Sequence, residues 1–332
     1  MKTLRLHAAG DLRLHDEPVP APAEGEALLR VTVVGVCGSD LQWFSQSGIG
    51  DARLEQPLVL GHEFAAVREK DDQRVAVDPA IPCGECELCR CGHPNLCPQV
   101  RFAGHGRLDG ALRERMTWPA LLLYPLPDTL TEADGAMLEP LGVALHAVDL
   151  SHLRLGMRVG VFGCGPIGLL IIQLACLSGA TQIIATDPLP HRLEAAQFCG
   201  ATQVLQADNG LEAPEVWETT ARCGVDAAFE VAGENAAVET AVHAAKPGGE
   251  VVLVGIPSDN RTSFSAATAR RKGLTLRLCR RMKHTYPRAI ALVEQGRLDV
   301  RSLVTHRFSL EQAQQAFEVA ARREGLKVII EI

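Results

Sequence analysis

Residues 158–187 read RVGVFGCGPIGLLIIQLACLSGATQIIATD. A short β-branched run ends at Gly163, an apolar helix-like stretch follows it, and a second buried run closes the segment. This order predicts a βαβ unit, in which a crossover helix joins two parallel strands. VDAAFEVAG (225–233) and GEVVLVGIP (249–257) flank another helix-like stretch and continue the alternation. The sequence therefore predicts an α/β domain with a doubly wound parallel sheet.

The turn inside this unit has the pattern G-x-G-x-x-G, formed by Gly163, Gly165 and Gly168. Such glycines let the backbone approach a pyrophosphate, and the helix N-terminus that follows presents free N–H groups to that anion. The pattern alone is common, but its place between a strand and a helix indicates a dinucleotide site. Asp187 ends the next strand, where a carboxylate binds both ribose hydroxyls and repels a 2′-phosphate. NAD is therefore favoured over NADP, although Arg192 nearby can tolerate a phosphate and keeps NADP open.

Four cysteines in the pattern C-x2-C-x2-C-x7-C fall within residues 83–97. Four thiolates at such spacings close a tetrahedral shell around Zn²⁺ from one loop, and a closed shell leaves no position for substrate. We therefore expect a structural zinc in this loop. Cys91 is a fifth thiol there, which we expect to be a bystander, although register alone does not exclude it. The expected ligands are Cys83, Cys86, Cys89 and Cys97.

Three further segments carry metal-ligating side chains outside that loop. They are GVCGSD with Cys37, GHE with His62 and Glu63, and LEPL with Glu139. A cysteine, a histidine and a carboxylate from separate segments can form an open zinc site, with one position left for water or an alcohol. Each segment alone is a weak indication, and only their combination with a dinucleotide fold points to a catalytic zinc. His105 lies in a glycine-rich loop, so we expect it to be a solvated loop residue, with an approach to the cleft as the alternative.

Composition narrows the class of protein. The chain has 332 residues, a length that fits two domains, and 47% hydrophobic and 22% charged residues, as in globular proteins. A net charge of −7 argues against nucleic-acid binding. The N-terminus lacks the apolar stretch of a secretory signal, and GLLIIQLACL is too short to span a bilayer. We therefore expect a cytoplasmic protein without a membrane partner, whose 11 cysteines include metal ligands rather than a disulfide framework.

Taken together, these motifs resemble the medium-chain, zinc-containing alcohol dehydrogenase superfamily, and within it the sorbitol (polyol) dehydrogenase branch. The resemblance runs nearly end to end, through GVCGSD, LVLGHEFAA, QRVAVDP, the cysteine loop, EPLGVALHA, GCGPIG and LVTHRFSLEQAQQAFE. It implies a GroES-like β-rich catalytic domain over residues 1–148, a Rossmann cofactor domain over 149–281 and a return to the catalytic domain over 282–332. It also implies an active site in the cleft between the domains and assembly as a homo-dimer or homo-tetramer.

The resemblance also assigns roles to single residues. Cys37, His62 and Glu63 match the catalytic zinc ligands. Glu139 matches a carboxylate that binds this metal directly, binds it through water or contacts the substrate. Arg281 matches an arginine that contacts the substrate. The cofactor contacts implied by the motifs and the resemblance are Gly163, Gly165, Pro166, Ile167, Gly168, Asp187, Arg192, Val254, Gly255, Ile256, Cys279, Arg280 and Arg281.

The implied reaction is hydride transfer from a secondary alcohol, above all a polyol, to NAD, with two zinc ions per chain. Ser39, two residues beyond Cys37, is the candidate that passes the alcohol proton outward. Polyol dehydrogenases carry tyrosines near the substrate position Trp43 and at Met282, and without these hydroxyls a pocket discriminates weakly among polyols. A sugar acid or a less polar secondary alcohol, as for a 2,3-butanediol-type dehydrogenase, is the alternative. A non-catalytic zinc-binding protein is disfavoured because Cys37 and His62 are intact.

Overall fold

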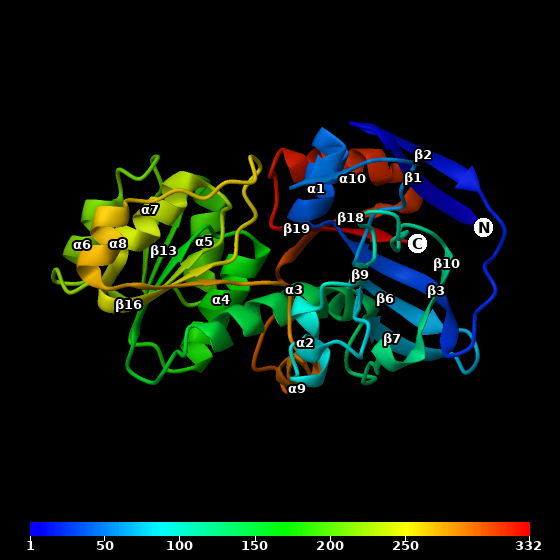
Figure 1. The fold of residues 1–332 in the computed structure, drawn as a ribbon, viewed down its shortest axis with the longest axis horizontal. Helices are drawn as coiled ribbons and strands as arrows, with labels where there is room; N and C mark the ends of the chain where they lie inside the picture. Colours follow the sequence, from blue (N-terminus) through cyan, green and yellow to red (C-terminus); the bar gives the residue numbers. More distant parts are fainter. The chain divides into compact units, whose positions relative to one another are not determined.

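The structure, a computed structural model, describes residues 1–332 and divides into two compact units (Figure 1). The first unit comprises Met1–Pro140 and Lys283–Ile332, and the second comprises Leu141–Met282. The chain leaves the first unit within one helix, α3 (Glu132–Leu150), and its C-terminal segment returns to that unit. None of the helices combines the length and the apolarity that a membrane span requires.

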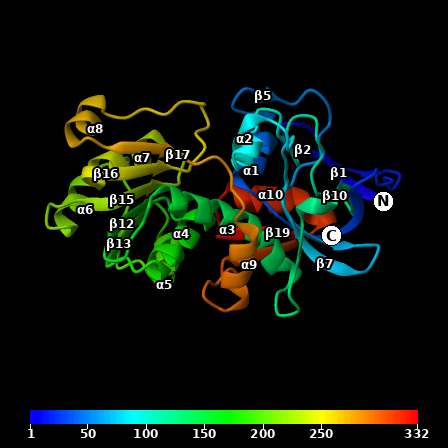
Figure 2. The ribbon, with the colours of Figure 1, turned by 60° about the horizontal axis from the view of Figure 1, so that its bottom comes forward.

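The second unit contains six parallel strands: β12 (Arg158–Phe162), β13 (Gln182–Asp187), β14 (Gln203–Gln206), β15 (Val225–Glu230), β16 (Ala245–Leu253) and β17 (Thr275–Leu278). Its helices are α4 (Pro166–Leu177), α5 (Pro190–Phe198), α6 (Ala213–Thr219), α7 (Asn235–Ala244) and α8 (Ala266–Lys272). The strand order is β14-β13-β12-β15-β16-β17, with α4 and α5 on one face of the sheet and α7 and α8 on the other (Figure 2). The predicted doubly wound α/β fold is confirmed.

This order fixes where a ligand can bind to the second unit. The direction of winding reverses at β12, so the loops after β12 and β15 separate at the carboxyl edge of the sheet. Doubly wound folds bind dinucleotides at such a point. The central strands β12, β13 and β15 are almost wholly buried because helices cover both faces of the sheet, which explains their apolar runs. Pro166 starts α4 and Gly179, with φ +78°, follows its end, as expected from residues that begin and stop helices.

The first unit is β-rich. Its main sheet contains β3 (Glu26–Gly35), β6 (Glu63–Arg68), β7 (Gln73–Val77), β10 (Arg115–Pro119), β11 (Leu123–Pro125), β18 (Val304–Ser309) and β19 (Lys327–Glu331). The order is β11-β7-β6-β3-β19-β18, and β10 also pairs with β3. Strand β3 thus lies between β6 and the C-terminal strand β19, and it pairs antiparallel with both.

Shorter elements surround this sheet. Phe44 of helix α1 packs against Phe317 of helix α10 with ring centroids 5.1 Å apart, which anchors α1 to the C-terminal segment. The short strands are β1 (Lys2–Ala8), β2 (Asp11–Asp16), β4 (Gly48–Ile49), β5 (Ala52–Arg53), β8 (Ala80–Ile81) and β9 (Arg101–Phe102). The helices are α1 (Gly38–Gln46), α2 (Glu87–Arg90), α9 (Tyr286–Glu294) and α10 (Ala313–Ala321), with 3₁₀ turns η1 (Pro94–Leu96), η2 (Ala120–Leu122) and η3 (Leu310–Gln312).

Helix α3 was not predicted from the sequence pattern. It runs for 19 residues with Pro140 inside it, and a proline removes one intrahelical hydrogen bond and usually ends a helix. Tertiary packing outweighs that cost here, because Ala133 and Ala136 form a buried cluster with Val33 of β3 and Ile329 of β19. The same helix carries Glu139, so its packing against the sheet determines where that carboxylate lies.

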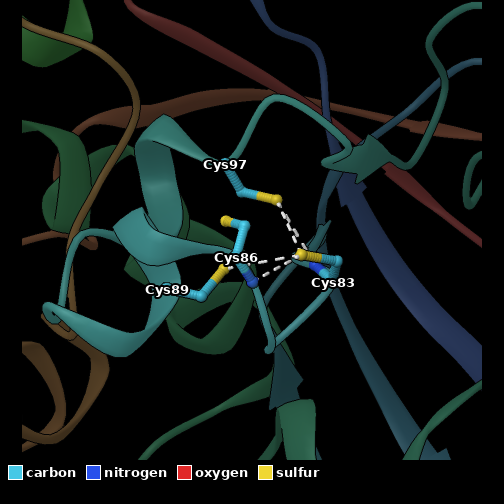
Figure 3. A group of neighbouring side chains, drawn as sticks. All are labelled: Cys83, Cys86, Cys89 and Cys97. Carbon is cyan, nitrogen blue, oxygen red and sulfur yellow. Dashed lines mark hydrogen bonds between the residues drawn. The ribbon is translucent and has the colours of Figure 1, made fainter.

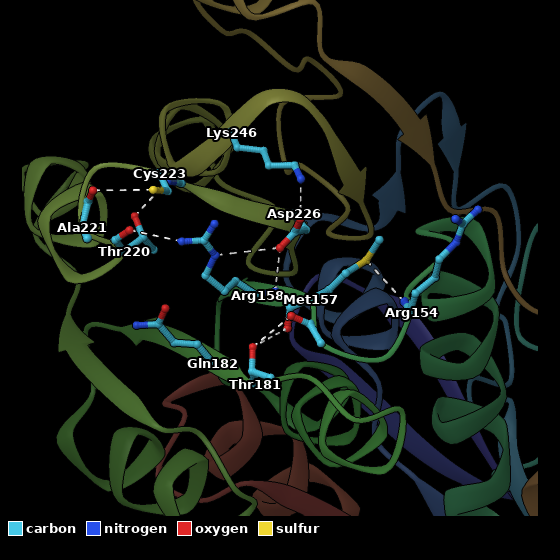
Figure 4. A network of polar contacts seen from close by, with 12 residues as sticks. Arg154, Met157, Arg158, Thr181, Gln182, Thr220, Ala221, Cys223, Asp226 and Lys246 are labelled. Carbon is cyan, nitrogen blue, oxygen red and sulfur yellow. Dashed lines mark hydrogen bonds and ion pairs between the residues drawn. The ribbon is translucent and has the colours of Figure 1, made fainter.

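A half-buried carboxylate joins the N-terminal ends of three neighbouring strands in the second unit (Figure 4). Asp226 of β15 accepts a hydrogen bond from the backbone N–H of Arg158 in β12 at 2.7 Å. It also forms an ion pair with Lys246 of β16 at 2.5 Å. Burial alone would raise the pKa of Asp226, but these two donors hold it below its ordinary value.

We predict that Asp226→Asn destabilises the second unit by about 1.5–3 kcal/mol at neutral pH, the range for hydrogen bonds to a charged group. The folded carboxyl has the lower pKa, so its stabilisation is present above the unfolded pKa of ~3.9 and is lost as the pH falls through the folded value. Thermal unfolding midpoints of wild type and variant should differ at neutral pH and converge in acid. Glu218→Gln, which removes an exposed ion pair with Arg222, is the control and should shift the midpoint little. A difference that does not change with pH would contradict the prediction.

Candidate active site

The four cysteines of the C-x2-C-x2-C-x7-C pattern converge in the first unit (Figure 3). Their sulfurs all lie within 4.8 Å of one another, and Cys83 Sγ lies 3.5 Å from Cys97 Sγ and 4.0 Å from Cys89 Sγ. Sulfurs that share one tetrahedral zinc at about 2.3 Å would lie ~3.8 Å apart. Backbone N–H groups of Glu85 and Cys86 lower the pKa of the Cys83 thiol to about 7, which favours the thiolate. The donor set fits a closed zinc shell, and the exposed Cys91 is not part of the group.

A second, three-residue group also lies in the first unit. The ligand atoms of Cys37, His62 and Glu63 all lie within 4.8 Å of one another. Strand pairing brings them together: Gly35 at the end of β3 is opposite Glu63 at the start of β6, and Cys37 then caps helix α1. His62 and Glu63 are 5% and 1% exposed, and Cys37 is half-buried. A thiol, an imidazole and a carboxylate fit a zinc site that keeps an open position.

Asp40 supports this group, although the sequence analysis did not single it out. Its Oδ1 lies 3.3 Å from His62 Nδ1, and the carboxylate accepts hydrogen bonds from the backbone N–H of Cys37 at 3.0 Å and of Gly61 at 3.3 Å. Burial alone would raise the pKa of Asp40, but His62 and these N–H groups hold it low. A carboxylate on Nδ1 orients the ring and leaves Nε2 as the metal donor. Its position three residues after the helix-capping Cys37 was the available signal.

Two more buried ionisable groups adjoin the three-residue group. Lys327 of β19 forms an ion pair with Glu63, and both side chains are almost fully buried. Glu139 of α3 is 5% exposed and lies outside the three-residue group. Burial is the main cause that raises the pKa of Glu139 to about 8; Glu63 raises it further, whereas His62 and Lys327 oppose the rise. The sequence analysis named Glu139 and missed Lys327, which directly precedes the apolar residues 328–330 of its strand.

One expectation from the sequence is wrong. His105 is not a solvated loop residue: it is half-buried, and its ring packs edge-on against Trp43 with centroids 5.5 Å apart. Its loop is held against the segment before His62, because Gly110 N–H donates to Val59 O at 2.7 Å and a Cβ on Gly110 would lie only 2.3 Å from a backbone oxygen. The ring of Phe102 at the start of this loop lies 5.1 Å from the His62 ring. Through these two ring contacts the loop packs against helix α1 at Trp43 and against the ring of His62.

In the second unit the dinucleotide motif has the expected close contacts. A Cβ on Gly163, whose φ is +110°, would lie 2.8 Å from Ala232 N, and one on Gly168 would lie 2.0 Å from Gly163 O. A Cβ on Gly165 would lie in open space, because the nearest atom to it, Arg192 Nη1, would be 3.9 Å away. Two of the three glycines are thus required for packing, and the third leaves the backbone accessible to a ligand.

Asp187 lies at the end of β13, 3% exposed, beside the glycine turn. Its two carboxylate oxygens accept hydrogen bonds at 2.9 Å from the backbone N–H groups of Cys164 and Leu189, and Oδ2 lies 3.9 Å from Arg192 Nη1. A carboxylate accepts about four hydrogen bonds, so capacity remains for ribose hydroxyls. Asp187 therefore also shapes the glycine turn, a role that the motif alone did not reveal.

Glu230 at the end of β15 is a further buried carboxylate that the sequence analysis missed. Its Oε1 accepts hydrogen bonds from Ala232 N–H at 2.8 Å and Gly233 N–H at 2.6 Å, and its backbone oxygen accepts one from Val254 N–H at 2.8 Å. It thus fixes the loops after β15 and β16 against each other, including Gly255 among the expected cofactor contacts. The other expected contacts, Ile256 in the loop after β16 and Cys279, Arg280 and Arg281 after β17, lie further along the same edge.

Comparisons with known proteins agree with this geometry. Residues 23–128 match the alcohol dehydrogenase GroES-like domain, and residues 166–295 match the zinc-binding dehydrogenase family. The chain belongs to the zinc-containing medium-chain alcohol dehydrogenases. This confirms the resemblance found in the motifs, and the chain is a zinc-type dehydrogenase of polyols or secondary alcohols.

Relatives of this dehydrogenase act on several alcohols. The sorbitol dehydrogenases of Bacillus subtilis and Homo sapiens are 36% and 35% identical to it, over 99% of this chain and 97% and 95% of theirs. Among solved structures, galactitol-1-phosphate dehydrogenase from Escherichia coli matches with a TM-score of 0.90 at 28% identity over 99% of both chains. The 2R,3R-butanediol dehydrogenase from Bacillus subtilis matches with a TM-score of 0.87 at 29% identity, over 100% of this chain and 99% of the other.

We predict that Cys86→Ser releases about one zinc equivalent per chain and lowers the thermal unfolding midpoint, because a structural zinc shell needs all four thiolates. Zinc content by atomic absorption, measured beside the unfolding curve, tests this. Cys91→Ser changes the exposed thiol of the same loop and should leave both quantities unchanged. Equal zinc loss in both variants would show that the closed shell is assigned to the wrong cysteines.

Proposed function

We propose that this dehydrogenase oxidises a secondary alcohol of the polyol class, with NAD as the hydride acceptor and two zinc ions per chain. The observation that carries the proposal is the three-residue group of Cys37, His62 and Glu63, whose donors form an incomplete shell. Zinc bound there supplies a Lewis acid that lowers the pKa of a substrate hydroxyl. Relatives named for sorbitol and galactitol-1-phosphate support the polyol class.

The chain's own groups then hold the alcohol and move its proton. Asp40 keeps the His62 ring in the orientation that presents Nε2. Ser39, half-buried at the start of α1, takes the hydroxyl proton and passes it toward solvent. The buried Glu139 carboxyl forms a hydrogen bond with a second polyol hydroxyl, or with water beside the metal. Substrate contacts also come from Trp43, and Arg281 is assigned the same role by the family pattern.

The cofactor site is assigned to the carboxyl edge of the second unit. Gly163, Gly165 and Gly168 receive the pyrophosphate at the N-terminus of α4, which starts with Pro166 and Ile167. Asp187 binds the adenosine ribose. The loops after β16 and β17 contact the rest of the dinucleotide through Val254, Gly255, Ile256, Cys279, Arg280 and Arg281. Assembly as a homo-dimer or homo-tetramer and a cytoplasmic location remain predictions.

A substrate panel tests the function directly. The full chain is assayed with NAD and with NADP on sorbitol, xylitol, galactitol, an aldonic acid, 2,3-butanediol and 2-propanol, and its zinc content is measured in parallel. We expect polyol-dependent NADH formation, and its loss in Cys37→Ser but not in Cys91→Ser. Turnover with 2,3-butanediol alone would move the assignment to diols. A zinc-loaded chain that oxidises no secondary alcohol would overturn the proposal.

The cofactor preference can be tested at one residue. Asp187→Asn removes the charge that repels a 2′-phosphate, so we predict a shift of at least about tenfold in the ratio of kcat/KM for NAD to kcat/KM for NADP, toward NADP. The ratio is the proper measure, because Asp187 also holds Cys164 and Leu189, and damage to the turn would affect both cofactors equally. Arg192→Gln should shift the ratio in the opposite direction. An unchanged ratio in Asp187→Asn would place the ribose elsewhere.

A further inference from the structure

We propose that Lys327 is a positioning residue of the active site: its ammonium shares the Glu63 carboxylate with the metal and so weakens Glu63 as a ligand. The inference rests on the proposed zinc at the three-residue group of Cys37, His62 and Glu63. It assigns a role to a residue of the last strand of the chain, which neither the motifs nor the dinucleotide fold indicate.

Lys327 contacts both segments that carry the cysteine and the carboxylate of the three-residue group. Its side chain is almost fully buried, and its Nζ forms an ion pair with Glu63 Oε2 and donates a hydrogen bond to Val36 O at 3.0 Å. Val36 directly precedes Cys37. The ammonium is therefore fixed between a ligand carboxylate and the backbone that carries the ligand thiol.

The sheet leaves space for this ion pair. Strand β3 lies between β6, which carries Glu63, and β19, which carries Lys327, and the pair crosses β3 at Gly35. A Cβ on Gly35 would lie 2.3 Å from Glu63 Oε2 and 3.0 Å from Lys327 Cε. Gly35 does not have a positive φ, so the glycine is required for space rather than for backbone conformation.

Burial of an ammonium is costly, and a buried ion pair often stabilises a fold no more than apolar side chains of similar volume would. Stability alone therefore does not explain a lysine in this position. The Glu63 carboxylate is the anionic partner in contact with this ammonium, and both side chains are almost fully buried. Without Lys327, the negative charge of the Glu63 carboxylate would be neutralised by the bound metal.

The sign of the effect follows from electrostatics. A carboxylate behind a metal ligand makes that ligand more basic and the metal more tightly held. An ammonium behind a ligand has the opposite charge and makes the Glu63 carboxylate a weaker donor. The metal then keeps more of its charge for the substrate hydroxyl, at some cost in affinity. A lysine that only holds β19 against β3 would have the opposite consequence, because its loss would loosen the ligands.

Lys327→Met, which keeps the length of the side chain and removes its charge, separates these two roles. We expect zinc release from the three-residue group to a chelator to slow by about tenfold and kcat to fall by about 10–100-fold, the scale of outer-shell effects. The pH at which kcat/KM reaches half its maximum should rise, because a less acidic metal lowers the hydroxyl pKa less. Lys327→Arg should restore both quantities. Faster zinc release in Lys327→Met would overturn the proposal.

A double-mutant cycle tests whether Lys327 acts through Glu63 or whether its replacement causes a general loss of structure. Glu63→Gln removes the carboxylate charge and is expected to speed zinc release. Adding Lys327→Met in that background should change the release rate little, because the lysine acts through Glu63. An equal effect of Lys327→Met in both backgrounds would contradict the inference.

Zinc release is measured without alcohol, and the four-cysteine zinc serves as the internal reference. A failure of the substrate panel would therefore overturn the proposed function and still leave the role of Lys327 decided by zinc release.

Discussion

The register of β3 against its two neighbours is the constraint on which the active site depends. Gly35 is opposite Glu63 on one side and Ile329 on the other, and Cys37 follows two residues later. A shift of one residue would reverse every side chain on the strand and would separate the thiol from the carboxylate. Hydrophobic packing enforces the register, since Leu29, Val31 and Val34 of β3 are fully buried in the core of the first unit. The site is therefore held by the same contacts that stabilise the sheet.

The two units use buried carboxylates in the same way. Asp40 in the first unit, and Asp187 and Glu230 in the second, each accept backbone N–H groups from a loop that carries ligand-binding residues. The N–H donors replace the hydrogen bonds that a carboxylate makes with water, and these bonds fix the loop around the buried carboxylate. These hydrogen bonds come from the chain itself and restrict the loops, and restricted loops lose less conformational freedom on binding.

The sequence predicted the parts of the site that depend on local spacing. The cysteine loop and the glycine turn could be recognised because their partners lie within a few residues along the chain. Lys327 could not, because its contact with Val36 joins residues 291 positions apart, and nothing in the strand KVIIE indicates its partner. His105 was misjudged for a similar reason: a glycine-rich stretch suggests an exposed loop, whereas long-range hydrogen bonds hold this one in place. Helix α3 was not predicted either, and packing against the sheet keeps it continuous through Pro140.

The fold that this family shares does not by itself determine the substrate. Relatives named for sorbitol and for 2,3-butanediol both align along nearly the whole chain. In this chain the hydroxyl expected near Trp43 is missing, yet that position is not purely apolar, because the His105 imidazole packs on the indole edge. A neutral imidazole, like a phenol, can both donate and accept a hydrogen bond. A site that binds a hydroxyl through a polar group rejects substrates that lack it far more strongly than an apolar wall does. Under the proposed function, the His105 imidazole can therefore supply the polar group that the missing tyrosine hydroxyl supplies in polyol dehydrogenases.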